Sequence, residues 1–329
     1  MILTDKIKEE ISGKNILLIL PKFYDYVDVI TKAFKNHGAH VTFFYDRDVT
    51  LLHTFVSNFK FQWLVYTQAW HYNKILRKTS DKKFDFMIVV KGLYLQPSFV
   101  EEIKTRNPGI KTILYQWDSI NFWLSDYRHL IPIFDETLSF DYEDCKTLGI
   151  PYVPTFSLQD GNINKDETHD YDFIFCANFT WEKFLFAKKI KQLFSEQGKK
   201  AFIYIYLNRF RFYLDKIKGK KLDDEIIKFK RLNNKQYQEV LGKSKMIIDY
   251  SHSIQSGLTM RAIDALATGK SLLTNNRYIS LEEDFNLEQV HFFDEEQLVI
   301  PDFSNEVVQL KRGKYSLDDW IYRILFTKK

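Results

Sequence analysis

Residues 246–276 constrain the fold more than any other stretch, because they contain a complete strand–helix–strand pattern. The apolar run at 246–248 predicts a buried strand, and polar residues 249–256 follow it as a loop. Leu258, Ile263 and Leu266 then recur on one face of a helix expected over 257–267. Gly269 stands where a helix C-terminal glycine would stand, and a second apolar run begins at residue 272. The pattern predicts a βαβ unit, in which a helix joins two parallel strands.

The loop that leads into this helix is the first candidate site. Backbone N–H groups and the helix dipole point into such a loop, so it can bind an anion. Gly257 would let a ligand approach the backbone closely. Arg261, in the first turn, could hold a diphosphate by two hydrogen bonds, or it could be an ordinary surface arginine. Asp264, three residues further on, could pair locally with Arg261.

The rest of the chain repeats the alternation of strands and helices in two series. The first series has strands at 15–20, 40–45, 86–90, 112–116, 133–140 and 152–156. The second has strands at 172–176, 201–206, 246–248, 272–273 and 290–293. The all-apolar run at 15–20 is typical of a parallel sheet covered on both faces. The sequence therefore predicts an α/β protein with two Rossmann-like domains, at 1–157 and 172–329, joined by a polar linker at 158–171.

Ligands bind beyond the carboxyl ends of strands in such sheets, so residues that follow strands are candidate site residues. Asp118 follows the strand at 112–116 and could act as a general base, or it could be a loop or capping aspartate. Asp141 stands in the same place after the next strand, and its spacing to Asp144 favours a helix cap. Asn178 and Lys183 follow the first strand of the second series, where Thr180 is a candidate cap.

Composition and missing motifs exclude several classes of protein. No G-x-G-x-x-G follows the first strand, which disfavours a dinucleotide dehydrogenase. The two cysteines have no metal or redox spacing, and no nucleic-acid motif accompanies the basic residues. The N-terminus has no signal-peptide core and no apolar run is long enough to span a bilayer, so a cytoplasmic protein is expected. Basic clusters at 188–200 and 209–221 are either solvated faces or attract diphosphates or an anionic membrane surface.

The segment from Gln255 to Arg261 (QSGLTMR), followed by Asp264-Ala265-Leu266-Ala267 and Gly269-Lys270, resembles the nucleotide-sugar segment of bacterial GT-B glycosyltransferases. It is similar in particular to enzymes of lipopolysaccharide, O-antigen and capsule biosynthesis. Retaining members of this group carry two glutamates eight positions apart. Here Asp264 matches the second acid and Ser256 stands at the first position, so the sequence departs from that pattern.

The resemblance implies a GT-B fold, with two Rossmann-like domains facing across a cleft. It implies a hexosyltransferase-like enzyme that moves a sugar from a nucleotide-diphosphate sugar to a hydroxyl of a glycan or lipid-linked acceptor. No metal or other cofactor would be needed, and residues 54–78 could meet the acceptor and the inner face of the membrane. Asp118 would be the catalytic base. The donor would be bound by Gln255, Ser256, Gly257, Leu258, Thr259, Arg261, Asp264, Asn178 and Lys183.

Two other functions are compatible with the same domain plan. A nucleotide-sugar epimerase would need acids on both walls of the cleft and no lipid acceptor. A non-catalytic two-domain protein would bind a ligand without turning it over.

Overall fold

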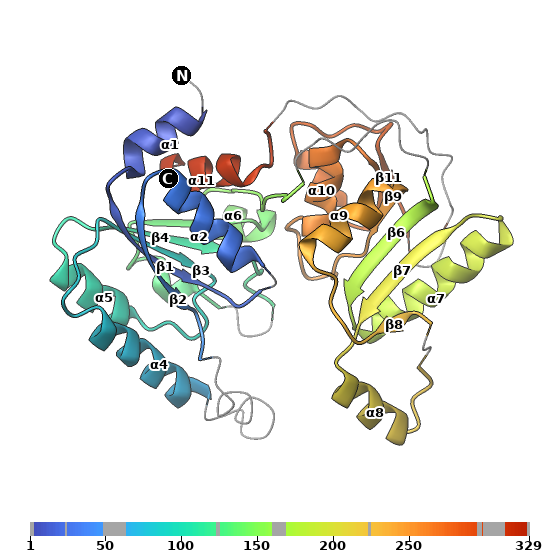
Figure 1. The fold of residues 1–329 in the computed structure, drawn as a ribbon, viewed down its shortest axis with the longest axis horizontal. Coiled ribbons are helices and arrows are strands. Elements are labelled where there is room, and N and C mark those ends of the chain that lie inside the picture. Colours follow the sequence, from blue (N-terminus) through green and yellow to red (C-terminus); the bar gives the residue numbers. More distant parts are fainter. Residues whose placement is uncertain are drawn as a thin grey trace. The chain divides into compact units, whose positions relative to one another are not determined.

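The computed structural model describes residues 3–23, 25–48, 64–122, 126–159, 169–222, 225–294, 298 and 313–327. Two compact units make up the chain (Figure 1). The first comprises residues 1–156, 253–257 and 317–329, and the second comprises residues 157–252 and 258–316. Of the predicted linker at 158–171, residues 160–168 lie outside the described part of the chain, as do residues 54–63 of the predicted acceptor segment.

The first unit contains a parallel five-stranded sheet in the order β2-β1-β3-β4-β5. Its strands are β1 (Asn15–Leu20), β2 (His40–Tyr45), β3 (Phe86–Val90), β4 (Lys111–Gln116) and β5 (Glu136–Ser139). Its helices are α1 (Leu3–Ile11), α2 (Tyr26–Asn36), α4 (Leu64–Lys78), α5 (Pro97–Arg106), α6 (Tyr142–Leu148) and α11 (Leu317–Phe326), with a short 3-10 turn at Arg128–Leu130.

Both faces of this sheet are covered, which explains the all-apolar sequence of β1. Leu17 and Ile19 pack with apolar residues of α4 and α5 on one face (Figure 1). On β4, the Tyr115 ring meets the Trp320 ring of α11 edge to face, with centroids 5.2 Å apart. The C-terminal helix therefore belongs to the core of the first unit.

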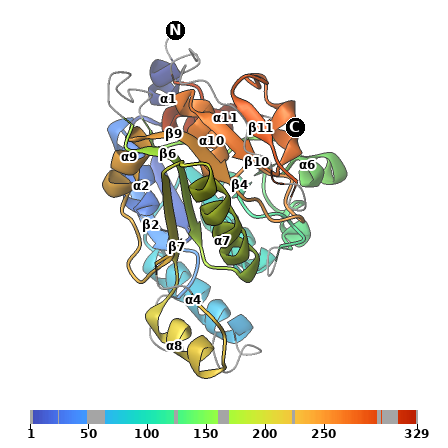
Figure 2. The same ribbon diagram turned by 90° about the vertical axis from the view of Figure 1, so that its right-hand side faces the viewer.

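The second unit contains a parallel six-stranded sheet in the order β11-β10-β9-β6-β7-β8. Its strands are β6 (Tyr171–Asn178), β7 (Ala201–Tyr206), β8 (Ile227–Lys228), β9 (Ser244–Asp249), β10 (Ser271–Thr274) and β11 (Val290–Phe292). Its helices are α7 (Trp181–Glu196), α8 (Arg209–Ile217), α9 (Asn234–Gly242) and α10 (Met260–Thr268), with a 3-10 turn at Arg277–Leu281. Figure 2 shows α7 lying across β6 and β7, where phenylalanines of the helix and the strands form a shared core.

The two parallel sheets confirm the predicted α/β class and the two Rossmann-like units. Some details are not as the sequence pattern suggested. Helix α10 begins at Met260 rather than 257, because the Thr259 hydroxyl accepts the Ala262 N–H and caps it. Residues 152–156 form no strand, and only Tyr152 bridges to Ser139. The basic segment at 209–217, for which the sequence allowed either a solvated helix face or a loop, is a helix, α8.

The turn that ends α10 forms as predicted. Gly269 has φ 70°, a left-handed conformation that glycine adopts without steric cost, and β10 begins two residues later. This short turn fixes the distance between α10 and its sheet. It thereby sets where the start of α10 lies relative to the carboxyl ends of β9 and β6, which pair in parallel.

Candidate functional site

The carboxyl ends of β6, β9 and β10 carry a group of polar residues in the second unit. Its centre is Asp249, the last residue of β9, which is fully buried. One carboxylate oxygen accepts the Thr259 hydroxyl at 2.6 Å and the Arg261 Nε–H at 3.2 Å. The other accepts the hydroxyls of Ser251 at 2.9 Å and Thr274 at 3.3 Å. Asp249 therefore fixes both the cap and the arginine of α10, a role that the sequence analysis missed.

Two cations lie around this carboxylate. Arg261 pairs with Asp249 and keeps about a fifth of its side chain exposed (21%). Lys183 lies in the first turn of α7, where the Thr180 side chain accepts its backbone N–H and caps the helix. The pKa of Lys183 is lowered to about 8, mainly by burial and then by the positive charge of Arg261, while Asp249 and Glu182 oppose the shift. Lys183 and Arg261 therefore lie around one buried, hydrogen-bonded carboxylate, and Glu182 is a further acid in the first turn of α7.

Both cations lie where a helix begins. Lys183 is in the first turn of α7 and Arg261 is the second residue of α10, and both helices are capped by threonines as described above. Cations at these positions oppose the helix dipoles, which favour negative charge. The arrangement costs stability in the absence of an anion, and an anion bound there would be attracted by both side chains and both helix ends.

Asp264 has a different environment from the one expected for a residue that pairs with Arg261. It is buried (5% exposed), and its Oδ1 accepts the Ser157 hydroxyl at 2.6 Å. Burial raises the pKa of Asp264 to about 7, although the Ser157 hydrogen bond and the charge of Arg261 oppose the shift. The ion pair of Arg261 goes to Asp249 instead. A contact of Asp264 with a donor nucleotide stays a prediction.

The loop at 253–257 lies in the first unit, although α10 lies in the second. The N–H groups of Ser256 and Gly257 donate to Asp141 Oδ2 at 2.9 and 3.0 Å, and the Gln255 side chain donates to the Gly257 carbonyl at 3.0 Å. Leu258 is buried (1% exposed). The sequence predicted donor contacts from all four residues. In the structure, two of the expected N–H donors already bind a carboxylate.

Asp141 caps α6 as predicted, because it accepts the Asp144 N–H at 3.1 Å. It also binds the Ser119 and Ser256 hydroxyls through short hydrogen bonds. Asp144 in turn accepts the Ile120 N–H at 2.8 Å and the Tyr127 hydroxyl at 2.9 Å. The two acids at the start of α6 thus hold the residues on the carboxyl side of Asp118.

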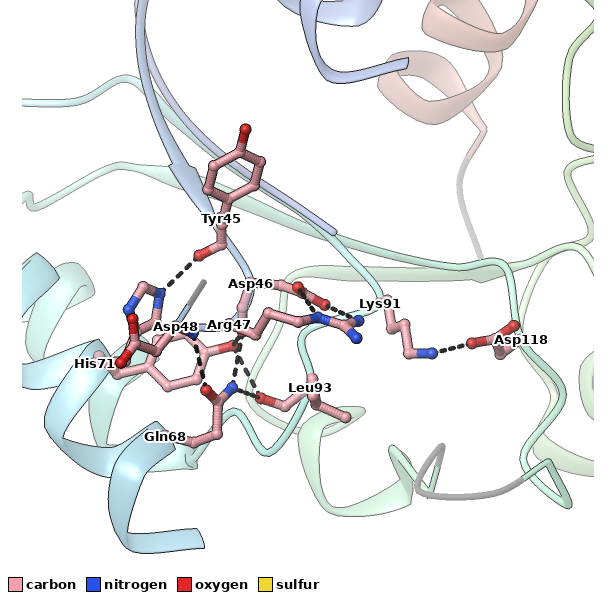
Figure 3. A network of polar contacts seen from close by, with 10 residues as sticks. Tyr45, Asp46, Arg47, Asp48, Gln68, His71, Lys91, Leu93 and Asp118 are labelled. Atoms are coloured by element: carbon pink, nitrogen blue, oxygen red, sulfur yellow. Dashed lines mark hydrogen bonds and ion pairs between the residues drawn. The ribbon is translucent and has the colours of Figure 1, made fainter. Parts of the chain in front are cut away.

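Asp118 lies in a charged network at the carboxyl ends of β2, β3 and β4 (Figure 3). Its carboxylate pairs with Lys91, and both side chains are partly exposed (23% and 17%). Lys91 has φ 68°, and it is held there because its N–H donates to the Tyr115 carbonyl and its own carbonyl accepts from the Gln116 side chain. The structure thus makes Lys91 the partner of Asp118.

The same network continues to β2 through Arg47, which binds the buried Asp46 at 2.9 and 3.2 Å (Figure 3). Burial opposes the charge of Arg47, yet Asp46 and more distant Asp118 raise its pKa overall. Gln68 of α4 donates to the carbonyls of Asp46 and Leu93, so α4 holds this edge of the sheet in place. Asn178, by contrast, ends β6 in the second unit and is exposed.

Two further observations concern the described part of the chain. Within it, no three His, Cys, Asp or Glu side chains come together in a way that could hold a metal ion. None of its helices has the length and apolar character that crossing a membrane requires.

Comparison with known proteins gives similarity in fold only. No family model matches the chain, and no curated protein matches it in sequence. Among solved structures, MurG of Acinetobacter baumannii matches with a TM-score of 0.45 and 7% identity, over 79% of this chain and 78% of that one. The MnaA–UDP structure from S. aureus matches with a TM-score of 0.48 and 14% identity, over 80% of this chain and 79% of that one.

Proposed function

We propose that the chain is a GT-B glycosyltransferase that moves a sugar from a nucleotide-diphosphate sugar to a hydroxyl of a bacterial surface glycan or lipid-linked intermediate. The observation that carries the proposal is the pair of cations, Lys183 and Arg261, beside Asp249 at two helix starts. Two adjacent phosphates carry the negative charge that would balance these two cations. The second unit would bind the donor, and Asp264 would lie near its ribose.

In this proposal the leaving diphosphate is stabilised by Arg261, Lys183 and the starts of α7 and α10. Asp249 holds Arg261 in a fixed orientation, so little reorganisation is needed as charge develops on the leaving group. These cations supply the stabilisation that a metal supplies in other transferases, and we expect transfer to survive chelation of divalent ions.

Asp118 is the proposed general base in the first unit. It would take the proton of the acceptor hydroxyl, with Lys91 orienting the carboxylate. The partly exposed Val65, Tyr66 and Trp70 of α4 would offer apolar and aromatic contacts to an acceptor sugar. The protein would work in the cytoplasm, at the inner face of the membrane where lipid-linked acceptors are made.

The donor site is tested by titrating nucleoside diphosphates into the protein in a calorimeter. We expect one nucleotide to bind, with an affinity that Arg261→Met abolishes and Arg277→Met leaves unchanged. Arg277 is the matched control because it is exposed (62%), lies in the same unit and pairs only with the exposed Asp294 among the ion pairs of the described residues. If no nucleotide binds, the proposed function is wrong.

The pH dependence of binding tests Lys183 separately. A bound anion favours the protonated amine, so affinity should fall as pH rises through about 8, the pKa of Lys183 in the free protein. The protonated fraction falls by about tenfold between pH 7 and 9, and the affinity should fall by the same factor. Lys183→Met should give a weaker and flat profile, whereas Lys188→Met, on the exposed face of α7, should keep the wild-type slope.

The chemistry is tested with Asp118→Asn. Loss of a general base should lower kcat by about 100-fold or more and leave nucleotide affinity unchanged, because Asp118 lies in the other unit. Asp126→Asn, an exposed aspartate of the same unit, is the control. Binding with reversible isomer formation and no transfer would identify an epimerase. Binding without any turnover would identify a binding protein.

A further inference from the structure

Helix α8 exposes a row of large apolar side chains, which we call the α8 stripe: Phe210, Tyr213, Leu214 and Ile217. Their exposed fractions are 70%, 55%, 39% and 82%. The spacing of three, four and seven residues places all four on one face of the helix. A contiguous exposed apolar face of this kind marks an interaction surface rather than a chance feature.

The opposite face of α8 is anchored to the second unit. Phe212 is buried (3% exposed) and meets the Phe229 ring edge to face, with centroids 4.9 Å apart. Asp215 is buried (6% exposed) and pairs with Lys220 at 2.9 Å. The Asn208 side chain caps the helix by accepting the Phe210 N–H. The orientation of the stripe is therefore fixed, and in both views α8 extends beyond the sheet of its unit (Figures 1 and 2).

Basic residues are frequent in and directly after α8, and the acids Asp223, Asp224 and Glu225 follow them in the sequence. Residues 209–222 contain one acidic residue, the buried Asp215, and six basic residues: Arg209, Arg211, Lys216, Lys218, Lys220 and Lys221. All six basic side chains are exposed. The charged ends of Arg209 and Lys216 lie over the rings of Phe229 and Phe212.

We propose that α8 binds the surface of an anionic lipid bilayer. The stripe would enter the boundary between headgroups and acyl chains, and the six cations would meet lipid phosphates. A second copy of the chain is a poorer occupant, because it would bring six further cations against the first six. This surface is independent of the proposed donor site, and bilayer binding can be measured whether or not the chain transfers sugars.

The apolar contribution is tested by sedimenting the protein with vesicles of phosphatidylcholine containing about one third phosphatidylglycerol. The double variant Phe210→Ser/Ile217→Ser should partition about tenfold less into these vesicles, because it removes the two most exposed side chains of the stripe. The matched control is Leu185→Ser/Leu287→Ser, which changes two apolar side chains of similar exposure (60% and 72%) elsewhere in the unit. This control should bind as the wild type does. Equal binding by all three proteins would overturn the proposal.

The charge contribution is tested with Lys218→Gln/Lys221→Gln on the same vesicles. Partitioning should fall about fivefold for each cation removed, and the wild type should dissociate as salt is raised. The wild-type protein should bind only weakly to vesicles of phosphatidylcholine alone. Binding that ignores lipid charge would contradict the proposal. The proposal would also be contradicted by a concentration-dependent dimer that the Phe210→Ser/Ile217→Ser variant abolishes, because that result would show that the α8 stripe binds a second copy of the chain.

Discussion

Replacing Asp264 with asparagine should stabilise the second unit in a pH-dependent way. Asparagine has nearly the same shape and can still bond to the Ser157 hydroxyl, but it cannot ionise. The buried carboxyl has a pKa of about 7, against 3.8 for an unburied aspartate, because burial penalises its charged form. Folding therefore favours the protonated carboxyl. The loss of unfolding free energy caused by ionising Asp264 is absent below about pH 3.8, grows as pH rises, and is complete above about pH 7.

The size of the effect follows from that shift. A difference between 3.8 and about 7 corresponds to about 4 kcal/mol of unfolding free energy once the carboxyl is ionised in both states. Between pH 5 and pH 8.5, where measurement is practical, the stability gained by Asp264→Asn should rise by about 2–3 kcal/mol. The rise should end above pH 8, because the folded carboxyl has by then lost its proton.

The assay is urea unfolding of both proteins across this pH range, followed by hydrogen exchange of peptides from α10. Every other titrating group is common to the two proteins, so the difference between them isolates Asp264. Asp294→Asn, whose side chain is 75% exposed, is the control and should give a flat difference. The reasoning fails if the Asp264→Asn difference is also flat, or if the variant loses stability as pH rises.

Three further predictions concern packing and anchoring in the first unit. Gly257→Ala should cost about 1–3 kcal/mol by urea unfolding, because the new Cβ would lie 2.6 Å from Phe140 Cδ2, and Phe140→Leu in the same chain should recover part of the loss. Asp141→Asn should lower the unfolding free energy by about 3 kcal/mol or more in a thermal scan, because a buried carboxylate bound by N–H and hydroxyl donors loses its charge. The exposed Asp126→Asn is the control and should change the unfolding free energy little. Trp320→Ala should cost about 3–5 kcal/mol, and hydrogen exchange should show the loss in β4 and α11.

The order of elements was predictable because apolar runs and their terminators are local signals. The apolar run at 15–20 predicted both ends of β1 correctly. Thr259 and Gly269 are residue types that cap and end helices. Helix α8 was harder to predict. Its apolar residues at 210, 213, 214 and 217 have helical spacing, but they face solvent, and the many lysines around them are equally typical of a loop.

The candidate site was predictable where a residue directly follows a strand. Asp118 and Lys183 were proposed because they follow strands, whereas Arg261 was proposed from its place in the first turn of a helix. The structure pairs Arg261 with Asp249, and the charges of both act on the pKa of Lys183. Asp249 was not found, although it also ends a strand, because its importance lies in contacts with Ser251, Thr259, Arg261 and Thr274 that only the folded sheet brings together. Pairings such as Lys91 with Asp118 depend likewise on strand order, which the sequence does not state.

Asp141 shows most clearly why spacing alone underestimates a residue. Its distance of three residues from Asp144 indicated a helix cap, and that contact exists. A carboxylate, however, can accept several hydrogen bonds, and a cap uses only one of them. The remaining capacity binds Ser119, next to Asp118, and the Ser256–Gly257 backbone of the loop that leads to α10. One buried side chain therefore fixes both the loop beside the proposed base and the loop before the proposed donor helix. A change at Asp141 should consequently lower stability and disturb both loops together, whereas Asp118→Asn should affect catalysis alone.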